Sequence, residues 1–264
     1  MAKNLPAVLV TGASSGIGAT YADRFARRGH DLVLVARDKV RMEATAAHLR
    51  TETGVKIDVL PADLTNSADV AKVEKRLRDD DKIGVLINNA GAAGGGGFAQ
   101  PDPGALERLI QLNVTAVTRL AAAAASRFAA RGEGTIVNIA SVVALIPNFS
   151  PGIYSATKSY VLTLSQTLQA ELGPKGVYVQ AVLPAGTRTE IWERSGRSAE
   201  EVKNMTGMMG VDELVDAALV GFDRREAITV PSLPDIHQWD AFNAAREAMI
   251  PNFPQEHAAV RYRA

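Results

Sequence analysis

Short runs that are apolar throughout alternate with helical patterns along most of this chain. Between the runs, apolar side chains recur every four residues, as Ile17, Tyr21 and Phe25 do. A strand that is apolar throughout is typical of a parallel sheet covered on both faces, whereas a half-exposed strand alternates apolar and polar residues. The sequence therefore predicts an α/β fold with a doubly wound parallel sheet and helices on both faces. Its strands are expected at 7–11, 31–36, 55–60, 85–88, 135–139, 177–183 and 228–230.

Helices are expected between these strands. The helix from Gly104 to Ala130 is long enough to bend or break near Asn113. The helix from Pro151 to Leu172 has a favourable start, because Ser150 can cap it and a first-turn proline lacks no hydrogen bond. No internal repeat or Pro/Ser-rich linker divides the chain, which predicts one domain over residues 1–264. The other expected helices lie at 17–29, 38–50, 70–77 and 214–222.

Charge and cysteine content narrow the possible functions. Lysine plus arginine and aspartate plus glutamate both total 29, so nothing favours nucleic acid or an anionic membrane as a partner. The chain has no cysteine, which excludes disulfides, thiol nucleophiles and cysteine-ligated metals. No secretory signal is visible and the alanine run 121–125 is too short to span a bilayer, so a cytoplasmic location is the default. The four histidines lack metal-binding spacing, and no metal site is expected.

Tyr154 and Lys158 stand four residues apart on the expected helix, so they share one of its faces. An ammonium group close to a phenol favours the phenolate, and Lys158 is expected to lower the pKa of Tyr154 below its usual value near 10. Such a tyrosine could act as an acid or base near neutral pH. The spacing alone leaves open a structural tyrosine beside an exposed lysine.

Glycines follow the first strand. Gly12, Gly16 and Gly18 would let the strand turn tightly into a helix whose N-terminal amides suit a pyrophosphate. Further polar residues follow the fourth and fifth strands, at Asn88 to Gly91 and at Ser141. The loop 94–97 is also glycine-rich, and it is either a phosphate cradle or a plain turn.

Together these motifs resemble the short-chain dehydrogenase/reductase family. The resemblance rests on Thr11 to Gly18, Asn88 to Gly91, Asn113, Ser141 and the Tyr154/Lys158 pair, and it extends over roughly residues 7 to 190. It implies a single-domain Rossmann fold and an oxidoreductase that interconverts a carbonyl and a secondary alcohol.

The resemblance also implies a role for each matching side chain. Tyr154 would be the general acid or base, and Ser141 would hold the carbonyl oxygen and stabilise its developing charge. Lys158 would lower the pKa of Tyr154 and hydrogen-bond the nicotinamide ribose. Asn113 would anchor a water in the proton relay.

The end of the second strand bears on the choice of cofactor. An acidic residue there would bind a ribose 2′-hydroxyl, but the chain has Ala36 followed by Arg37, whose guanidinium suits a 2′-phosphate. Asp38 could argue for the hydroxyl, although it resembles the N-cap of the next helix. NADP(H) is therefore expected over NAD(H), and Asp63 would face the adenine. The other expected cofactor-binding residues are Gly12, Ser14, Ser15, Gly16, Ile17, Gly18, Leu64, Asn89, Ala90, Gly91, Tyr154, Lys158, Pro184, Thr187 and Thr189.

The loop after the sixth strand departs from the family pattern. The family usually has Pro-Gly, but this chain reads Pro184-Ala185-Gly186, with Thr187 and Thr189 following. Residues 190–210 come next and contain Trp192 and several methionines, which are typical of an adaptable apolar surface. They are expected to form a substrate lid, the alternative being a short amphipathic helix docked permanently on the core.

Two other functions are weighed. An NAD(P)-using epimerase or dehydratase on the same fold usually has a longer chain with a substrate domain and a TGxxGxxG turn, and neither is present. A non-catalytic dinucleotide sensor would be expected to have lost Tyr154 or Lys158, and both remain. The reductase interpretation needs only a small-molecule carbonyl or alcohol as partner, and its substrate class is left open. The related enzymes pair through the helices that correspond to 121–125 and 151–172, so a homodimer or homotetramer is expected.

Overall fold

The computed structural model describes residues 5–94, 97–149, 152–196 and 198–263, and the chain falls into two compact units, Met1–Pro231 and Ser232–Ala264. The first unit is built on a parallel sheet of seven strands in the order β3-β2-β1-β4-β5-β6-β7. This confirms the predicted doubly wound fold. The strands are β1 (Ala7–Thr11), β2 (Leu32–Ala36), β3 (Ile57–Pro61), β4 (Ile83–Asn88), β5 (Gly134–Ile139), β6 (Val177–Val182) and β7 (Ile228–Thr229).

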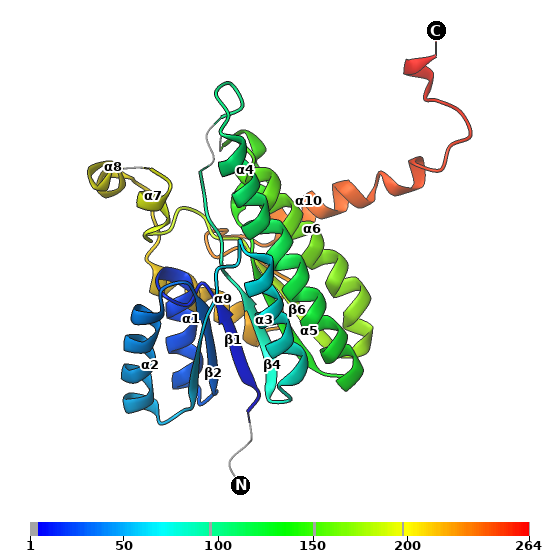
Figure 1. The fold of residues 1–264 in the computed structure, drawn as a ribbon. Coiled ribbons are helices and arrows are strands. Elements are labelled where there is room, and N and C mark those ends of the chain that lie inside the picture. Colours follow the sequence, from blue (N-terminus) through cyan, green and yellow to red (C-terminus); the bar gives the residue numbers. More distant parts are fainter. Residues whose placement is uncertain (1–4, 95–96, 150–151, 197, 264) are drawn as a thin grey trace. The chain divides into compact units, whose positions relative to one another are not determined.

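Helices cover both faces of this sheet (Figure 1). Alternate strand residues point to opposite faces, so Val8 and Val10 join one core and Leu9 joins the other. Helices α1, α2 and α9 pack on the first face, while α3, α5 and α6 pack on the second. The bounds are α1 (Gly16–Arg27), α2 (Lys39–Thr53), α3 (Ser67–Asp79), α5 (Val117–Arg131), α6 (Tyr154–Leu172) and α9 (Val211–Asp223).

The long helix predicted from Gly104 to Ala130 changes its winding in the middle. It consists of α4 (Pro103–Ile110), a π-helical segment (Gln111–Ala116) and α5. Asn113 lies inside the π segment and is buried. A π segment inside an α-helix is often found at a functional site, because the wider turn redirects side chains and leaves backbone groups free.

Other elements differ from the sequence prediction. Helix α6 begins at Tyr154, three residues later than expected; Ser150 and Pro151 lie outside the described residues, as does part of the loop 94–97. The expected lid contains two short helices, α7 (Ile191–Arg194) and α8 (Ala199–Asn204), the second started by a capping box at Ser198. Strand β3 is only partly buried because it is the edge of the sheet.

The second unit was not anticipated as an ordered segment. It contains α10 (His237–Glu247), in which the rings of Trp239 and Phe242 lie 5.7 Å apart at a tilt of 39°, followed by two 3-10 turns. None of its described residues is buried. The single domain over 1–264 stays a prediction. Throughout the part of the chain that the structure describes, no helix combines the length and apolarity that a bilayer crossing requires.

Candidate dinucleotide and active site

A cleft of about 1220 Å³ opens beyond the carboxyl ends of the strands. In a doubly wound sheet this is where ligands bind, because loops diverge there at the switch in strand order between β1 and β4. Of the sequence-predicted site residues, only Gly18 and Asn113 do not line it. Those that line the cleft are Gly12, Ser14, Ser15, Gly16, Ile17, Arg37, Asp63, Leu64, Asn89, Ala90, Gly91, Ser141, Tyr154, Lys158, Pro184, Thr187 and Thr189.

The turn from β1 into α1 requires its glycines. Gly12 and Gly16 have φ of 67° and 53°, in the left-handed region that side chains disfavour. A Cβ on Gly18 would lie 2.3 Å from the carbonyl oxygen of Gly12, and one on Gly12 would lie 2.7 Å from Asn89 Nδ2. The turn after β1, the start of α1 and the loop after β4 therefore pack closely, and side chains at Gly12 and Gly18 would not fit.

Helix α1 has a free N-terminal end. Its N-cap Ser15 makes no side-chain hydrogen bond to the helix amides, and its hydroxyl instead accepts a hydrogen bond from Arg194 Nη2 at 3.3 Å. The first amides of α1 therefore face the cleft without a side-chain cap, as a pyrophosphate site requires. Thr11 and Asn89 hold the turn beside them, since Thr11 Oγ1 accepts from Asn89 N at 2.9 Å and Asn89 Nδ2 donates to Thr11 O at 2.9 Å.

The end of β2 presents one unpaired cation. Arg37 is exposed, lines the cleft and makes no side-chain ion pair or hydrogen bond with any residue that the structure describes. Asp38 is the N-cap of α2 and accepts from Arg41 N at 3.0 Å, so its carboxylate is committed to the helix. Asp63 accepts two hydrogen bonds from Thr65 at the cleft wall.

Tyr154, Ser141 and Lys158 come together in the middle of the cleft. Burial raises the pKa of Tyr154 to about 12, while its hydrogen bond with Ser141 lowers it. The expectation that the pKa of Tyr154 falls below its usual value because of Lys158 is therefore wrong. The Lys158 ammonium lies 5.8 Å from the Tyr154 ring centroid and donates to the carbonyl of Ile139 at 2.8 Å, so burial of the phenol dominates.

Lys158 itself is affected by burial. Its side chain is 6% exposed, and burial lowers its pKa to about 8. A lysine in this state is partly neutral in mildly alkaline solution, because a buried ammonium is poorly solvated.

Asn113 positions two parts of the site instead of lining it. Its Nδ2 donates to Ala92 O at 2.9 Å and to Thr157 Oγ1 at 3.1 Å, and its Oδ1 accepts from Ala92 N at 3.0 Å. Thr157 Oγ1 donates in turn to the carbonyl of Tyr154 at 2.8 Å. Asn113 thus joins the loop after β4 to the first turn of α6, and Thr157 was not predicted as a site residue from the sequence.

The loop with the displaced glycine is tied to the expected lid. Gly186 O accepts from Met209 N at 2.8 Å, and Arg188 N donates to Met209 O at 3.0 Å. A Cβ on Gly186 would lie 2.7 Å from the sulfur of Met208, so any larger residue would require the flexible Met208 side chain to move. Trp192 Nε1 donates to Thr187 O at 2.7 Å, which fixes α7 next to the same loop.

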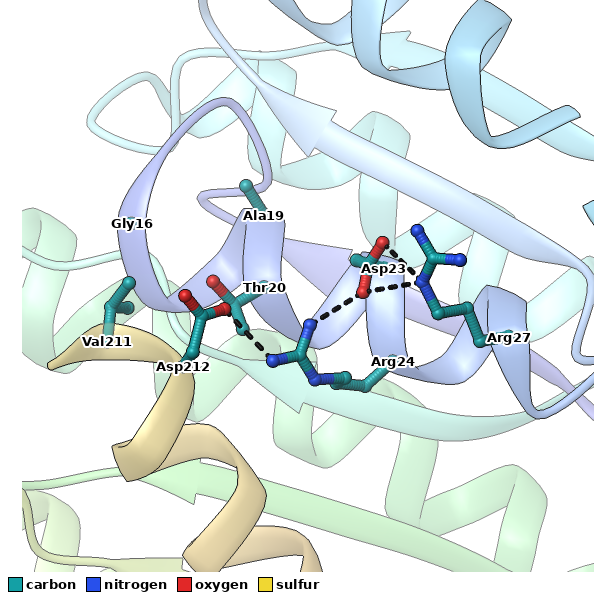
Figure 2. A pocket seen from close by; sticks show the side chains of 8 residues that line it. All are labelled: Gly16, Ala19, Thr20, Asp23, Arg24, Arg27, Val211 and Asp212. Atoms are coloured by element: carbon teal, nitrogen blue, oxygen red, sulfur yellow. Dashed lines mark hydrogen bonds and ion pairs between the residues drawn. The ribbon is translucent and has the colours of Figure 1, made fainter. Parts of the chain in front are cut away.

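A second, smaller cavity of about 370 Å³ lies between α1 and the start of α9. Figure 2 shows that Arg24 reaches across it to Asp212 and also pairs with Asp23, which pairs in turn with Arg27. Hydrogen bonds with Asp216 and then Asp23 raise the pKa of Arg24. These charges neutralise one another, and the only predicted site residue in the lining is Gly16. Within the described ranges no group of three or more histidine, cysteine or acidic side chains could hold a metal ion.

Comparisons with known proteins show which family this chain resembles. The family model for short chain dehydrogenases matches residues 6–200. The very-long-chain 3-oxoacyl-CoA reductase-A of Danio rerio is 31% identical over 191 residues, which cover 69% of this chain and 58% of that protein. The human 17-beta-hydroxysteroid dehydrogenase type 3 is 32% identical over 184 residues, which cover 69% of this chain and 59% of that protein. The chain thus spans less than two thirds of the length of these relatives.

Solved structures match over nearly the whole chain. A short-chain dehydrogenase from Sphingobium yanoikuyae in complex with NADPH is 62% identical, with a TM-score of 0.95 over 98% of this chain and all of the other. The bulky-bulky ketone specific alcohol dehydrogenase from Comamonas testosteroni is 55% identical, with a TM-score of 0.92 over 99% and 100%. A Burkholderia phymatum protein in complex with NAD is 26% identical, with a TM-score of 0.77 over 98% and 100%.

Proposed function

This chain belongs to the short-chain dehydrogenase family of oxidoreductases, and we propose that it uses NADPH to interconvert a ketone and a secondary alcohol, with Tyr154 as the proton donor. The observation that carries the proposal is the meeting of Tyr154, Ser141 and Lys158 in the cleft that the glycine turn opens. Non-catalytic binding would not require a hydroxyl pair beside a buried lysine.

The residues present fit a dinucleotide. The turn at Gly12 to Gly18 and the uncapped start of α1 suit its pyrophosphate, and Arg37 suits a 2′-phosphate. A relative's complex with NADPH supports the same preference, whereas a more distant relative is in complex with NAD. The bound cofactor would supply the hydride; the chain supplies the positions and the proton.

The chain's own part in reduction is the transfer of a proton. A phenol with a pKa of about 12 keeps its proton at neutral pH, which is the form that a general acid needs. The Tyr154 hydroxyl donates to the substrate oxygen as negative charge develops there. Ser141, whose hydroxyl donates to Pro184 O at 3.3 Å, would turn its single proton to the same oxygen and hold it with a second hydrogen bond. Lys158 donates one proton to Ile139 O, and its remaining protons would be available to hydrogen-bond the ribose of a bound cofactor.

We further propose ketones with two bulky substituents as the substrate class. The cleft of about 1220 Å³ is larger than the ~300–1,000 Å³ of most small-molecule pockets, so substrate and dinucleotide fit side by side. A relative with 55% identity is named as specific for bulky-bulky ketones. The apolar side chains that line the cleft include Leu109, Val143, Ile146, Trp192, Met205 and Met208.

A cofactor-oxidation assay tests the proposal. NADPH consumption at 340 nm is followed with matched ketones that differ only in whether one substituent is methyl or bulky. We expect turnover of the bulky ketones with NADPH. Binding of NADPH without turnover of any carbonyl would contradict the reductase and favour the sensor, and loss of water or inversion of a hydroxyl group without net NADPH use would favour the dehydratase or epimerase.

A further inference from the structure

An ion-pair cluster joins the start of α2 to the start of the lid. Glu190 stands directly before α7, and both of its carboxylate oxygens accept from Arg41 Nη1 at 2.9 Å. Arg194, one turn later, also donates to this carboxylate at 2.5 Å. Arg41 lies in the first turn of α2, four residues after Arg37.

The place of this cluster matters for the cofactor. Arg37, Asp38 and Glu190 all line the cleft, at the end where β2 gives way to α2. This is where a cofactor's 2′-phosphate is expected. Of the two arginines at this end of α2, Arg37 has no partner among the described residues. Arg41 is not itself a lining residue, and it pairs with Asp38 at 3.5 Å and with the carboxylate of Glu190 at 2.9 Å.

We propose that Arg41 is a second cation for the 2′-phosphate, and that the Glu190 carboxylate pairs with Arg41 when no phosphate is bound. This inference rests on the proposed use of NADPH. A phosphate monoester carries about −1.5 to −2 charges at pH 7, so it attracts Arg41 more strongly than a carboxylate does and repels Glu190. Glu190 keeps Arg194 as a partner when it leaves Arg41, so the exchange leaves no charged group without a partner.

The exchange makes Glu190 a residue that selects the cofactor and positions the lid. NADH has a hydroxyl in place of the phosphate, so it leaves the Glu190–Arg41 pair intact and the lid tied to α2. NADPH separates them. Another link of the lid to the cofactor site, from Arg194 to Ser15, lies at the start of α1 and does not depend on the 2′ position.

Calorimetric titration of the full chain with NADPH and with NADH tests the proposal. Glu190→Gln removes the competing charge, and we expect the Kd for NADPH to fall roughly twofold to fivefold while that for NADH stays the same. Arg41→Gln should weaken NADPH roughly tenfold and spare NADH. In the Arg41→Gln background, Glu190→Gln should no longer change the Kd for NADPH. Glu193→Gln, in the same helix but outside the cleft lining, is the control for loss of one negative charge.

Two outcomes would overturn the inference. One is that Glu190→Gln changes the Kd values for NADPH and NADH equally. The other is that Glu193→Gln changes the Kd for NADPH as much as Glu190→Gln does. Hydrogen exchange of residues 191–196 gives a second readout, since we expect it to differ between saturating NADPH and saturating NADH, and the difference to vanish in Glu190→Gln. Because these measurements need no substrate, a protein that binds NADPH without reducing a ketone would refute the proposed reaction but not the exchange of partners.

Discussion

Replacement of Asn113 by alanine should cost both stability and catalysis. The side chain is 1% exposed and makes three hydrogen bonds, two to the backbone of Ala92 and one to Thr157. Leaving a buried polar partner unsatisfied costs about 1–3 kcal/mol. Ala92 is only partly buried, so water can replace some of the hydrogen bonds that its backbone loses with Asn113. We therefore expect Asn113→Ala to lower the free energy of unfolding by about 2–4 kcal/mol.

The catalytic effect follows from the link to α6. Thr157 bonds both Asn113 and the carbonyl of Tyr154, so losing Asn113 loosens the turn that carries the proton donor. A misplacement of about 1 Å can cost about a hundredfold in rate, and we expect kcat to fall roughly tenfold to hundredfold.

Urea unfolding and ketone reduction measure the two effects in the same samples. Gln111→Ala is the matched control, because Gln111 lies in the same π segment and is only partly buried. It should change the free energy of unfolding by less than about 0.5 kcal/mol. If Asn113→Ala were as stable and as active as that control, the positioning role argued for Asn113 would be refuted.

Three further predictions concern the cofactor, pH and assembly. Arg37→Gln should weaken NADPH binding roughly tenfold to hundredfold without changing stability, since Arg37 has no partner in the described chain; equal losses for NADH in calorimetry would contradict this. Burial lowers the pKa of Lys158 to about 8 from 10.5, so between these values the unfolded chain holds a proton that the folded chain lacks. The free energy of unfolding of the wild-type protein, relative to that of Lys158→Met, should therefore rise by about 2 kcal/mol from pH 7 to 9.5. A difference between the two proteins that does not change with pH would refute this prediction. We expect a homo-oligomer that pairs through α5 and α6, where Tyr160 is 39% exposed; a monomeric mass by light scattering would contradict it.

The fold and the centre of the site were predictable because they depend on local pattern. Buried parallel strands must be apolar throughout, and β1, β2, β4, β5 and β6 are buried along almost their whole length. The glycines and the Tyr154–Lys158 spacing are equally local, since a turn and a helix face fix their geometry.

What could not be predicted depends on contacts between distant segments. The pKa of Tyr154 is raised by burial in the folded chain, an effect that the spacing from the lysine four residues away did not predict. Glu190 and Arg41 are 149 residues apart, so their pairing has no sequence signal. The start of α6 at Tyr154 also differs, because Ile153 is its N-cap and not Ser150. The helix α10 was not predicted, because it has no buried face that would impose an apolar pattern on its sequence.

The most direct test of the proposed reaction is the turnover of Tyr154→Phe. The substitution removes only the hydroxyl and keeps the aromatic ring, so fold and NADPH binding should persist. The variant and the wild-type protein are compared by NADPH oxidation with a bulky ketone at saturating cofactor, after calorimetry has shown equal Kd values for NADPH. We expect kcat to fall by at least about a hundredfold, the usual contribution of a general acid. A variant that binds NADPH and reduces the ketone at the wild-type rate would show that Tyr154 is not the proton donor.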